Sequence, residues 1–311
     1  MSKSGKEHFI RPEMGVFIGV LSVSFAAIFV RFNEAPPIII AFYRLLFSVP
    51  LFTFIALKNN REELKSISKK NVVKCGLAGF FLALHFVTWF ASLKYTSVAS
   101  SLVLVTCHPI LIIFASKFLF KEQIGKKSVT GVIIAFIGCI VISGGDYSFS
   151  GTALYGDILA FIGAICMALY LITGRTVRMK ISASVYIMLI YLSCLLVLFL
   201  GVIITKTPFT GYSATDFISF LALALICHSL GHGLFNWALA YVSPTFVSTA
   251  IIGEVAGSVI LAALILKEIP TYWQILGGII TVVGIVYYNV TYKKPIESNI
   301  LIRKYEASDK T

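Results

Sequence analysis

Long apolar stretches separated by short polar connections run through almost the whole chain. An α-helix rises about 1.5 Å per residue, so about 20 apolar residues cross the hydrocarbon core of a bilayer as a helix. We count ten such stretches, at residues 14–31, 36–57, 72–93, 96–119, 128–144, 154–174, 183–205, 215–240, 244–266 and 270–291. The pattern therefore predicts an all-α integral membrane protein with ten transmembrane helices.

The composition agrees with this prediction. Hydrophobic residues make up 58% of the chain and charged residues only 13%, whereas soluble domains carry about 25% charged residues. All six cysteines fall within the apolar stretches, without the C-x-x-C spacing of many metal and redox sites, and we interpret them as core residues. The first stretch is followed by no small-residue cleavage site, so we interpret it as a retained helix.

The distribution of basic residues indicates the orientation. With the N-terminus inside, 21 of the 26 Lys and Arg residues fall on the cytoplasmic side, as the bias of these residues towards cytoplasmic loops requires. The remaining five are Arg31, Lys94, Lys206 and Lys267 outside and Arg44 within a stretch. We therefore expect a multi-pass protein of the plasma membrane, of bacterial inner-membrane type, with both termini cytoplasmic. The net charge of +12 follows from these loops and tails, and we expect no nucleic-acid partner.

The two halves of the sequence repeat each other. A shift of 146 residues aligns residues 95–138 with residues 241–284 without a gap. The aligned identities include Tyr95 with Tyr241, Ser97 with Ser243, Lys121-Glu122 with Lys267-Glu268, Gly131 with Gly277, and Gly138 with Gly284. Each half holds an odd number of predicted helices, so the second half must enter the membrane upside down. Inverted repeats of this kind are typical of secondary transporters.

Three segments carry a resemblance to a known family: "AFYRLLFS" in the second stretch, "CHPILIIFASKFLFKE" in the fourth, and "GHGLFNWALAYVSPTFVSTAIIGEVAG" across the eighth and ninth. Together with the two five-helix halves, they resemble the EamA-type transporters of the drug/metabolite transporter superfamily. The family's ninth helix carries Glu-Pro where this chain has Glu254-Val255. The resemblance implies a ten-helix exporter or importer of small metabolites. We expect a first EamA-like repeat at 12–145, a second at 150–291, and a cytoplasmic basic tail at 292–311.

Two charged residues lie deep within the predicted helices. An ionisable group at the centre of a transmembrane helix costs about 2.5–3.5 kcal/mol on insertion scales, so such a group needs a partner, a water-filled cavity or a function. Glu254 is the only carboxylate at this depth. It is a candidate for proton titration or for binding a cationic substrate group, and otherwise a structural acid between close-packed helices. Arg44 either holds a substrate carboxylate or pairs with Glu254 or with backbone carbonyls.

Further polar and aromatic residues are candidates for a central cavity. His228, His232 and Asn236 recur every four residues and share one helix face. The repeat maps His108 onto Glu254, and His85 onto a neighbour of His232. The remaining candidates for the lining are Tyr43, Trp89, Tyr170 and Trp237. Any one histidine or aromatic residue is more often a packing element, but their common depth favours a shared cavity.

These observations favour a secondary active transporter over an enzyme. We expect it to move a small metabolite, an amino acid or a related compound, outward by alternating access between the two repeats, with protons as the coupling ion. There is no G-x-x-x-x-G-K-[ST] segment, and we expect no cofactor. The alternative is a transition-metal carrier or metal-dependent intramembrane protein that uses the buried histidines and Glu254. A channel or lipid-handling protein stays open too, as does the choice between monomer and homodimer.

Overall fold

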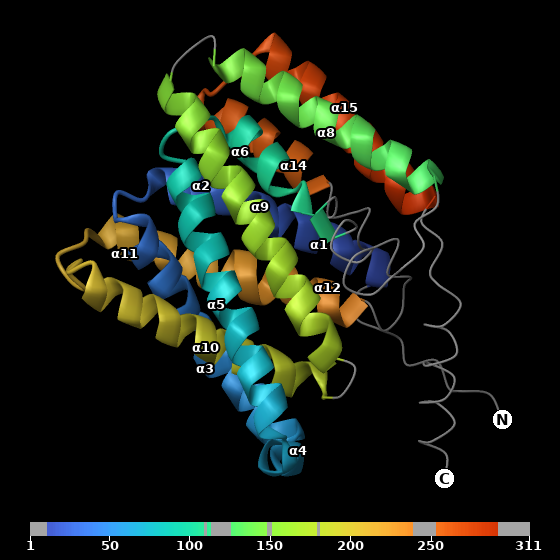
Figure 1. The fold of residues 1–311 in the computed structure, drawn as a ribbon. Coiled ribbons are helices and arrows are strands. Elements are labelled where there is room, and N and C mark those ends of the chain that lie inside the picture. The colour runs from blue at the N-terminus through green and yellow to red at the C-terminus, as the bar shows by residue number, and fades with distance from the viewer. Residues whose placement is uncertain are drawn as a thin grey trace.

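The computed structural model describes residues 11–108, 111–112, 126–147, 151–178, 181–238 and 253–291, and over these residues the chain forms helices and no strand (Figure 1). The helices of the first half are α1 (Pro12–Ser24), α2 (Ala26–Phe32), α3 (Pro37–Asn59), α4 (Arg61–Ser66), α5 (Lys69–Ser92), α6 (Val98–Val105) and α8 (Lys126–Tyr147). The short helix α4, between α3 and α5, has no buried residue.

The second half contains two π-helical segments in addition to its α-helices. Its helices are α9 (Gly151–Arg178), α10 (Ala183–Ile204), α11 (Ala214–Ala222), η1 (Leu223–His232), α12 (Gly233–Ala238), α14 (Gly253–Leu261), η2 (Ala262–Leu266) and α15 (Tyr272–Thr291). The π-helices are η1 and η2. The first of them continues α11 into α12, so these three elements form one long helix.

Within the described residues, six helices are long and apolar enough to cross a membrane. They are residues Pro12–Phe32, Pro37–Asn59, Lys69–Ser92, Gly151–Gly174, Ala183–Ile204 and Ala214–Phe235. The predicted all-α multi-pass membrane protein is confirmed. The stretches predicted at 96–119 and 244–266 extend beyond the described residues, so the number of ten stays a prediction.

Local chemistry explains where several helices begin. Pro37 occupies the first turn of α3, where the missing N–H of proline costs nothing. The hydroxyl of Ser97 accepts a hydrogen bond from the Ser100 amide at the start of α6. At the start of α11, Ser213 and Asp216 form a capping box in which each side chain accepts from the other's backbone amide. At α6 and α11 the capping side chains therefore satisfy free N–H groups of the first turn.

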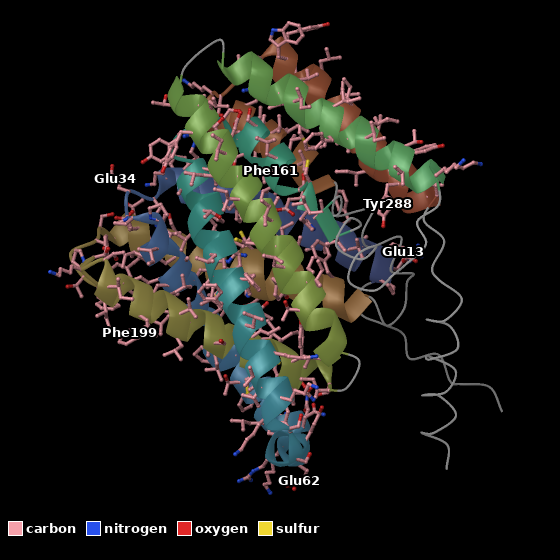
Figure 2. The ribbon with its side chains drawn as sticks, in the orientation of Figure 1. Glu13, Glu34, Glu62, Phe161, Phe199 and Tyr288 are labelled. Atoms are coloured by element: carbon pink, nitrogen blue, oxygen red, sulfur yellow. The ribbon has the colours of Figure 1, made fainter. Side chains whose placement is uncertain are left out.

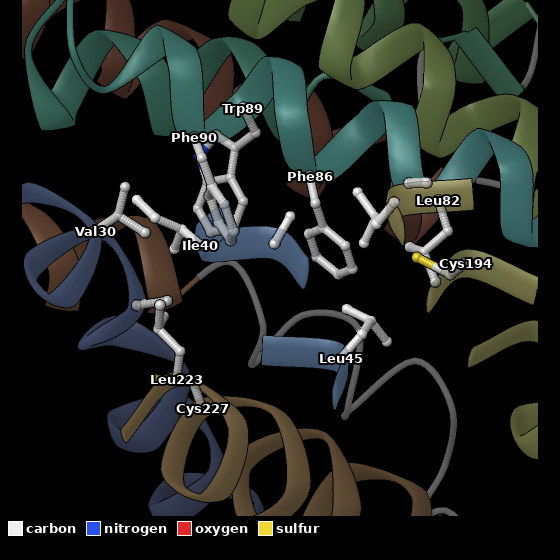
Figure 3. Close-up of a cluster of buried hydrophobic side chains, with 14 of the residues drawn as sticks. Val30, Ile40, Leu45, Leu82, Phe86, Trp89, Phe90, Cys194, Leu223 and Cys227 are labelled. Carbon is white, nitrogen blue, oxygen red and sulfur yellow. The ribbon is translucent and has the colours of Figure 1, made fainter. Parts of the chain in front are cut away.

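The main core lies where α3, α5, α10 and η1 meet. Figure 3 shows Phe86, Trp89 and Phe90 of α5 facing the α3 residues Ile40 and Leu45, with Leu223 and Cys227 of η1 on the other side. Phe90, Leu45 and Leu223 are fully buried. The outward side chains are also apolar, and Phe199 on α10 points away from the bundle (Figure 2). This distribution suits helices surrounded by lipid.

Candidate functional site

Arg44 lies in the middle of α3 and is 2% exposed. Its Nε and Nη2 atoms lie 3.3 and 3.1 Å from Nδ1 of His228 on η1. Its guanidinium also lies over the ring of Phe86, 4.5 Å from the ring centroid, in a cation–π contact. For Nδ1 to accept from Arg44, the His228 ring must be neutral with its proton on Nε2. The direct contact of Arg44 is therefore with a histidine, a partner that was not expected from the sequence.

His228 is held in an aromatic environment. Its ring centroid lies 4.6 Å from that of Tyr191 and 5.7 Å from that of His232. The π-helical geometry of η1 rotates side chains relative to an α-helix, and such segments recur at functional sites. The sequence did not single out Tyr191 or Phe86, because an aromatic residue at helical spacing looks like any other core residue.

Three buried side-chain nitrogen atoms have no hydrogen-bond partner among the described residues. They are Nη1 of Arg44 on α3, Nε1 of Trp89 on α5 and Nε2 of His228 on η1. A buried donor without a partner costs about 1–3 kcal/mol. Because all three belong to helices that meet around one core, the cluster is suited to bind a polar molecule that offers hydrogen-bond acceptors.

His85 and Trp89 lie one turn apart on α5. The Nδ1 atom of His85 lies 2.9 Å from the carbonyl oxygen of Gly163 on α9, and its ring stacks on Trp89 with centroids 5.9 Å apart. His85 thus joins α5 to α9 through one ring nitrogen. It is a helix-packing contact between the two halves of the chain, and it orients Trp89.

Glu254 lies in the first turn of α14, where the helix crosses α1. Ser258 Oγ donates to the backbone oxygen of Ser24 over 2.9 Å, and a Cβ at Gly257 would collide with the Ser24 side chain. The small residues around Glu254 therefore allow close helix approach, as the sequence pattern indicated. The side chain of Glu254 interacts electrostatically with Arg44. The carboxylate and the cation that the sequence places deep in the membrane, Glu254 and Arg44, are therefore close enough for their charges to interact.

The other predicted site residues take different positions. Nδ1 of His108 lies 3.2 Å from the carbonyl oxygen of Val105, the last residue of α6. His232 packs against Phe235 and, as described, against His228. The Tyr43 hydroxyl donates to the Phe209 carbonyl over 2.8 Å, which ties α3 to the loop before α11. Tyr170 packs at the edge of the main core. The side chains of Asn236 and Trp237 lie outside the described residues.

The metal alternative finds no support in the geometry. Among the described residues, no three His, Cys, Asp or Glu side chains gather as a metal ion would require. Nδ1 of His228 is engaged by Arg44. The spacing of His228 and His232 on one helix therefore reflects their aromatic packing in this structure.

Comparisons with known proteins bear on the resemblance seen in the sequence. Residues 11–144 and 154–290 each match the model of the EamA-like transporter family. An uncharacterized transporter, YxxF of Bacillus subtilis, is 26% identical over 258 residues, with 82% of each chain covered. A probable amino-acid metabolite efflux pump of Salmonella typhimurium is 24% identical, over 87% of this chain and 91% of the other.

The fold is also found among solved structures. One crystal structure superposes with a TM-score of 0.61 at 17% identity, covering 90% of this chain and 96% of the other. A likeness at this identity shows the fold alone. The two family matches cover most of the chain and confirm the resemblance. The chain belongs to the EamA-like transporter family of the drug/metabolite transporter superfamily.

Proposed function

We propose that this protein is a secondary active transporter that exports a small metabolite, an amino acid or a related compound, by alternating access. The observation that carries the proposal is the polar cluster of the buried Arg44, His228 and Trp89 with the half-buried Glu254. Its members come from both halves of the chain and retain unpaired donors. The amino-acid metabolite named for the Salmonella relative fits a ligand with both acceptor and cationic groups.

The packing of the helices supports an inverted repeat. Helix α1 packs against η1 and α14, and its counterpart α9 packs against the counterparts α5 and α6. Helices α8 and α15 lie side by side (Figure 1), with Gly131 against Gly284 and Gly138 against Gly277. Gly131 thus faces the repeat partner of Gly138, and Gly138 faces the repeat partner of Gly131. A two-fold relation between the halves accounts for both patterns, and such folds carry substrate between the repeats.

The chemistry of the cluster suggests how an amino acid would bind. The free Nη1 donors of Arg44 and the indole N–H of Trp89 suit a carboxylate, which accepts several hydrogen bonds. The carboxylate of Glu254 suits an ammonium group or a proton. Because protonation changes the charge of Glu254, it links substrate binding to the proton gradient. Proton coupling through Glu254 is therefore part of the proposal.

A ligand screen tests the substrate class. Thermal unfolding of the purified protein is measured in detergent with L-amino acids, amines, nucleosides and divalent metals. A ligand at about 100 times its Kd stabilises the fold by about 2.7 kcal/mol, which is readily seen. We expect stabilisation by one or more amino acids, weakened in Arg44→Lys, since lysine cannot reproduce the guanidinium donors. Stabilisation by zinc alone would refute the proposal in favour of a metal carrier.

A transport assay tests the coupling. In proteoliposomes with radiolabelled L-amino acids, we expect Glu254→Gln to bind substrate and to lose uptake driven by a pH gradient. Glu13→Gln is the matched control, because Glu13 is exposed at the start of α1. Full gradient-driven transport by Glu254→Gln would show that another group carries the proton.

A further inference from the structure

Three carboxylates of the second half bind loops of the first half at one end of the molecule. They are Asp157 on α9, Asp216 on α11 and Glu268 in the loop before α15. We name these three residues and their partners the clasp. Each of the three contacts joins residues far apart in the sequence, so the clasp fastens one half of the chain to the other.

Glu268 makes the most strongly charged contact of the clasp. Its Oε2 lies 2.9 Å from Nη2 of Arg31, and its Oε1 accepts the Val98 amide at the start of α6 over 2.6 Å. Arg31 also donates from Nη1 to the carbonyl oxygen of Leu93 over 2.6 Å. Glu268 and Arg31 are 21% and 29% exposed, so water weakens this ion pair less than one on the open surface. One carboxylate thus holds both α2 and α6.

Asp216 holds the loop between α2 and α3. Its Oδ1 accepts the Glu34 amide over 2.9 Å, and its backbone oxygen accepts Nδ2 of the buried Asn33. The carbonyl oxygen of Asn33 accepts from Nζ of Lys94 over 2.7 Å. Two first-half loops are therefore bound to each other and to the start of α11.

The third contact joins α9 to the loop before α6. The Thr96 hydroxyl donates to Oδ1 of Asp157 over 2.8 Å. Gly156 allows this approach, because a Cβ there would lie 2.6 Å from the Thr96 amide nitrogen. Asp157 is 2% exposed, although it is a carboxylate. This short pair is closed to solvent and fixed by packing.

Glu34, whose amide donates to Asp216, lies at an end of the molecule away from Glu13 and Glu62 (Figure 2). The charge distribution of the loops predicts that this is the outer end. A cleft of about 290 Å³ opens beside the clasp and is lined by Arg31, Lys94, Thr96 and Glu268, among others. Nearby, Ala99, Val259, Glu268 and Gln274 pack around a gap that is too narrow for a water molecule.

We propose that the clasp is the gate that closes the central cluster from this end, and that it must part for substrate to leave. The inference rests on the proposed transport function. Every clasp contact spans the two halves, and alternating access moves these halves relative to each other. Contacts that hold the closed state and are lost in the open state set the balance between the two.

Labelling of a reporter cysteine tests the gate without any substrate. Ala99 is 8% exposed and packs at the same narrow gap as Glu268. In nanodiscs, we expect Ala99→Cys to react slowly with a membrane-impermeant maleimide. Adding Glu268→Gln or Arg31→Gln should raise the labelling rate about ten-fold, since each removes a charge-assisted hydrogen bond of the closed state. Glu62→Gln is the control, because it breaks only the exposed pair with Lys65.

A reversible cross-link tests whether the clasp must part. In Thr96→Cys/Asp157→Cys, mild oxidation joins the two thiols and releases two protons and two electrons to the oxidant, copper phenanthroline. We expect counterflow of radiolabelled L-amino acids in proteoliposomes to stop on oxidation and to return with dithiothreitol. The matched control is Ser92→Cys/Ser101→Cys, whose hydroxyls lie 2.6 Å apart within the first half. That cross-link should leave counterflow unchanged.

The outcomes of these experiments test the proposed gate and the proposed transport function independently of each other. Equal labelling of Ala99→Cys with and without Glu268→Gln would overturn the gate, and so would full counterflow by the oxidised Thr96→Cys/Asp157→Cys variant. If the reduced proteins and the wild type show no counterflow, the proposed substrate class fails. The labelling rates then still decide for or against the gate. Size-exclusion profiles and thermal unfolding confirm that each variant is folded.

Discussion

Arg44 and His228 form a contact that can be tested one residue at a time. Replacing His228 with Leu leaves the buried guanidinium without its acceptor, and we expect the free energy of unfolding to fall by about 1.5–3 kcal/mol. The double variant Arg44→Gln/His228→Leu should lose less than the sum of the two single variants, because the unpaired charge is gone. Thermal unfolding in detergent of the four proteins measures this coupling. Additive losses would mean that the two side chains are not coupled.

The sequence predicts that Tyr43 lines the central cavity, but in the structure its contacts are those of a packing residue. Its hydroxyl donates to the Phe209 carbonyl, and its ring stacks on Phe220 with centroids 4.7 Å apart. We therefore expect Tyr43→Phe to lower the free energy of unfolding by about 0.5–1.5 kcal/mol and to leave ligand affinity unchanged. A ligand titration monitored by thermal shift checks both quantities. A loss of affinity without a loss of stability would return Tyr43 to the substrate site.

The depth of each polar residue in the membrane could be predicted from the sequence, but the residues that it contacts could not. Hydropathy placed Arg44, His228 and Glu254 in the middle of their helices, because an apolar stretch of known rise fixes the depth of each position. Which of them meet depends on the rotation of each helix about its axis. That rotation follows from close packing among all neighbours, and it brought Arg44 to His228. The free-energy cost of an unpaired polar side chain in lipid explains why each of these residues needs a partner, but it does not identify that partner.

At the scale of elements, the pairing of α8 with α15 depends on glycine. A Cβ at Gly138 would lie 2.6 Å from both the Gly277 oxygen and the Thr281 nitrogen, which are backbone atoms and cannot turn aside. We expect Gly138→Ala to lower the free energy of unfolding by about 1–3 kcal/mol, as overpacking does. Gly151→Ala at the start of α9 is the control, because nothing lies within 4 Å of its Cβ position. Equal thermal stability of the two variants would contradict this role.

Some features of the helices could be predicted from sequence patterns, and others could not. The six helices long enough to span a membrane each coincide with a predicted stretch, since length and apolarity are local properties. The π-helices η1 and η2 were not predicted. A π-helical turn inserts one extra residue in a helix and is stable only where tertiary contacts compensate for its looser packing. In η1 those contacts include His228 against Tyr191 and Arg44, which no local pattern contains.

At the scale of the whole molecule, the polar contacts discussed above form two groups. One is the central cluster, and the other is the clasp at one end of the helices. The central cluster carries donors without a partner among the described residues, whereas the clasp is built from hydrogen bonds that join the two halves. A transporter needs both kinds of feature. Its binding site must bind and release the substrate, whereas its gate must close completely. The family relationship establishes a transporter, and these two regions are where its substrate and its opening are proposed to lie.

The orientation of the molecule decides which compartment the clasp faces, and two exposed positions can test it. Lys65 lies on α4, and Thr210 lies in the loop before α11 at the opposite end. With 21 of the 26 basic residues predicted inside, we expect a membrane-impermeant maleimide to label Thr210→Cys in intact cells and to spare Lys65→Cys. After the cells are opened, both should react, which shows that each introduced thiol is accessible. The reverse pattern would place the clasp on the cytoplasmic side, and the gate would then control entry of substrate from the cytoplasm.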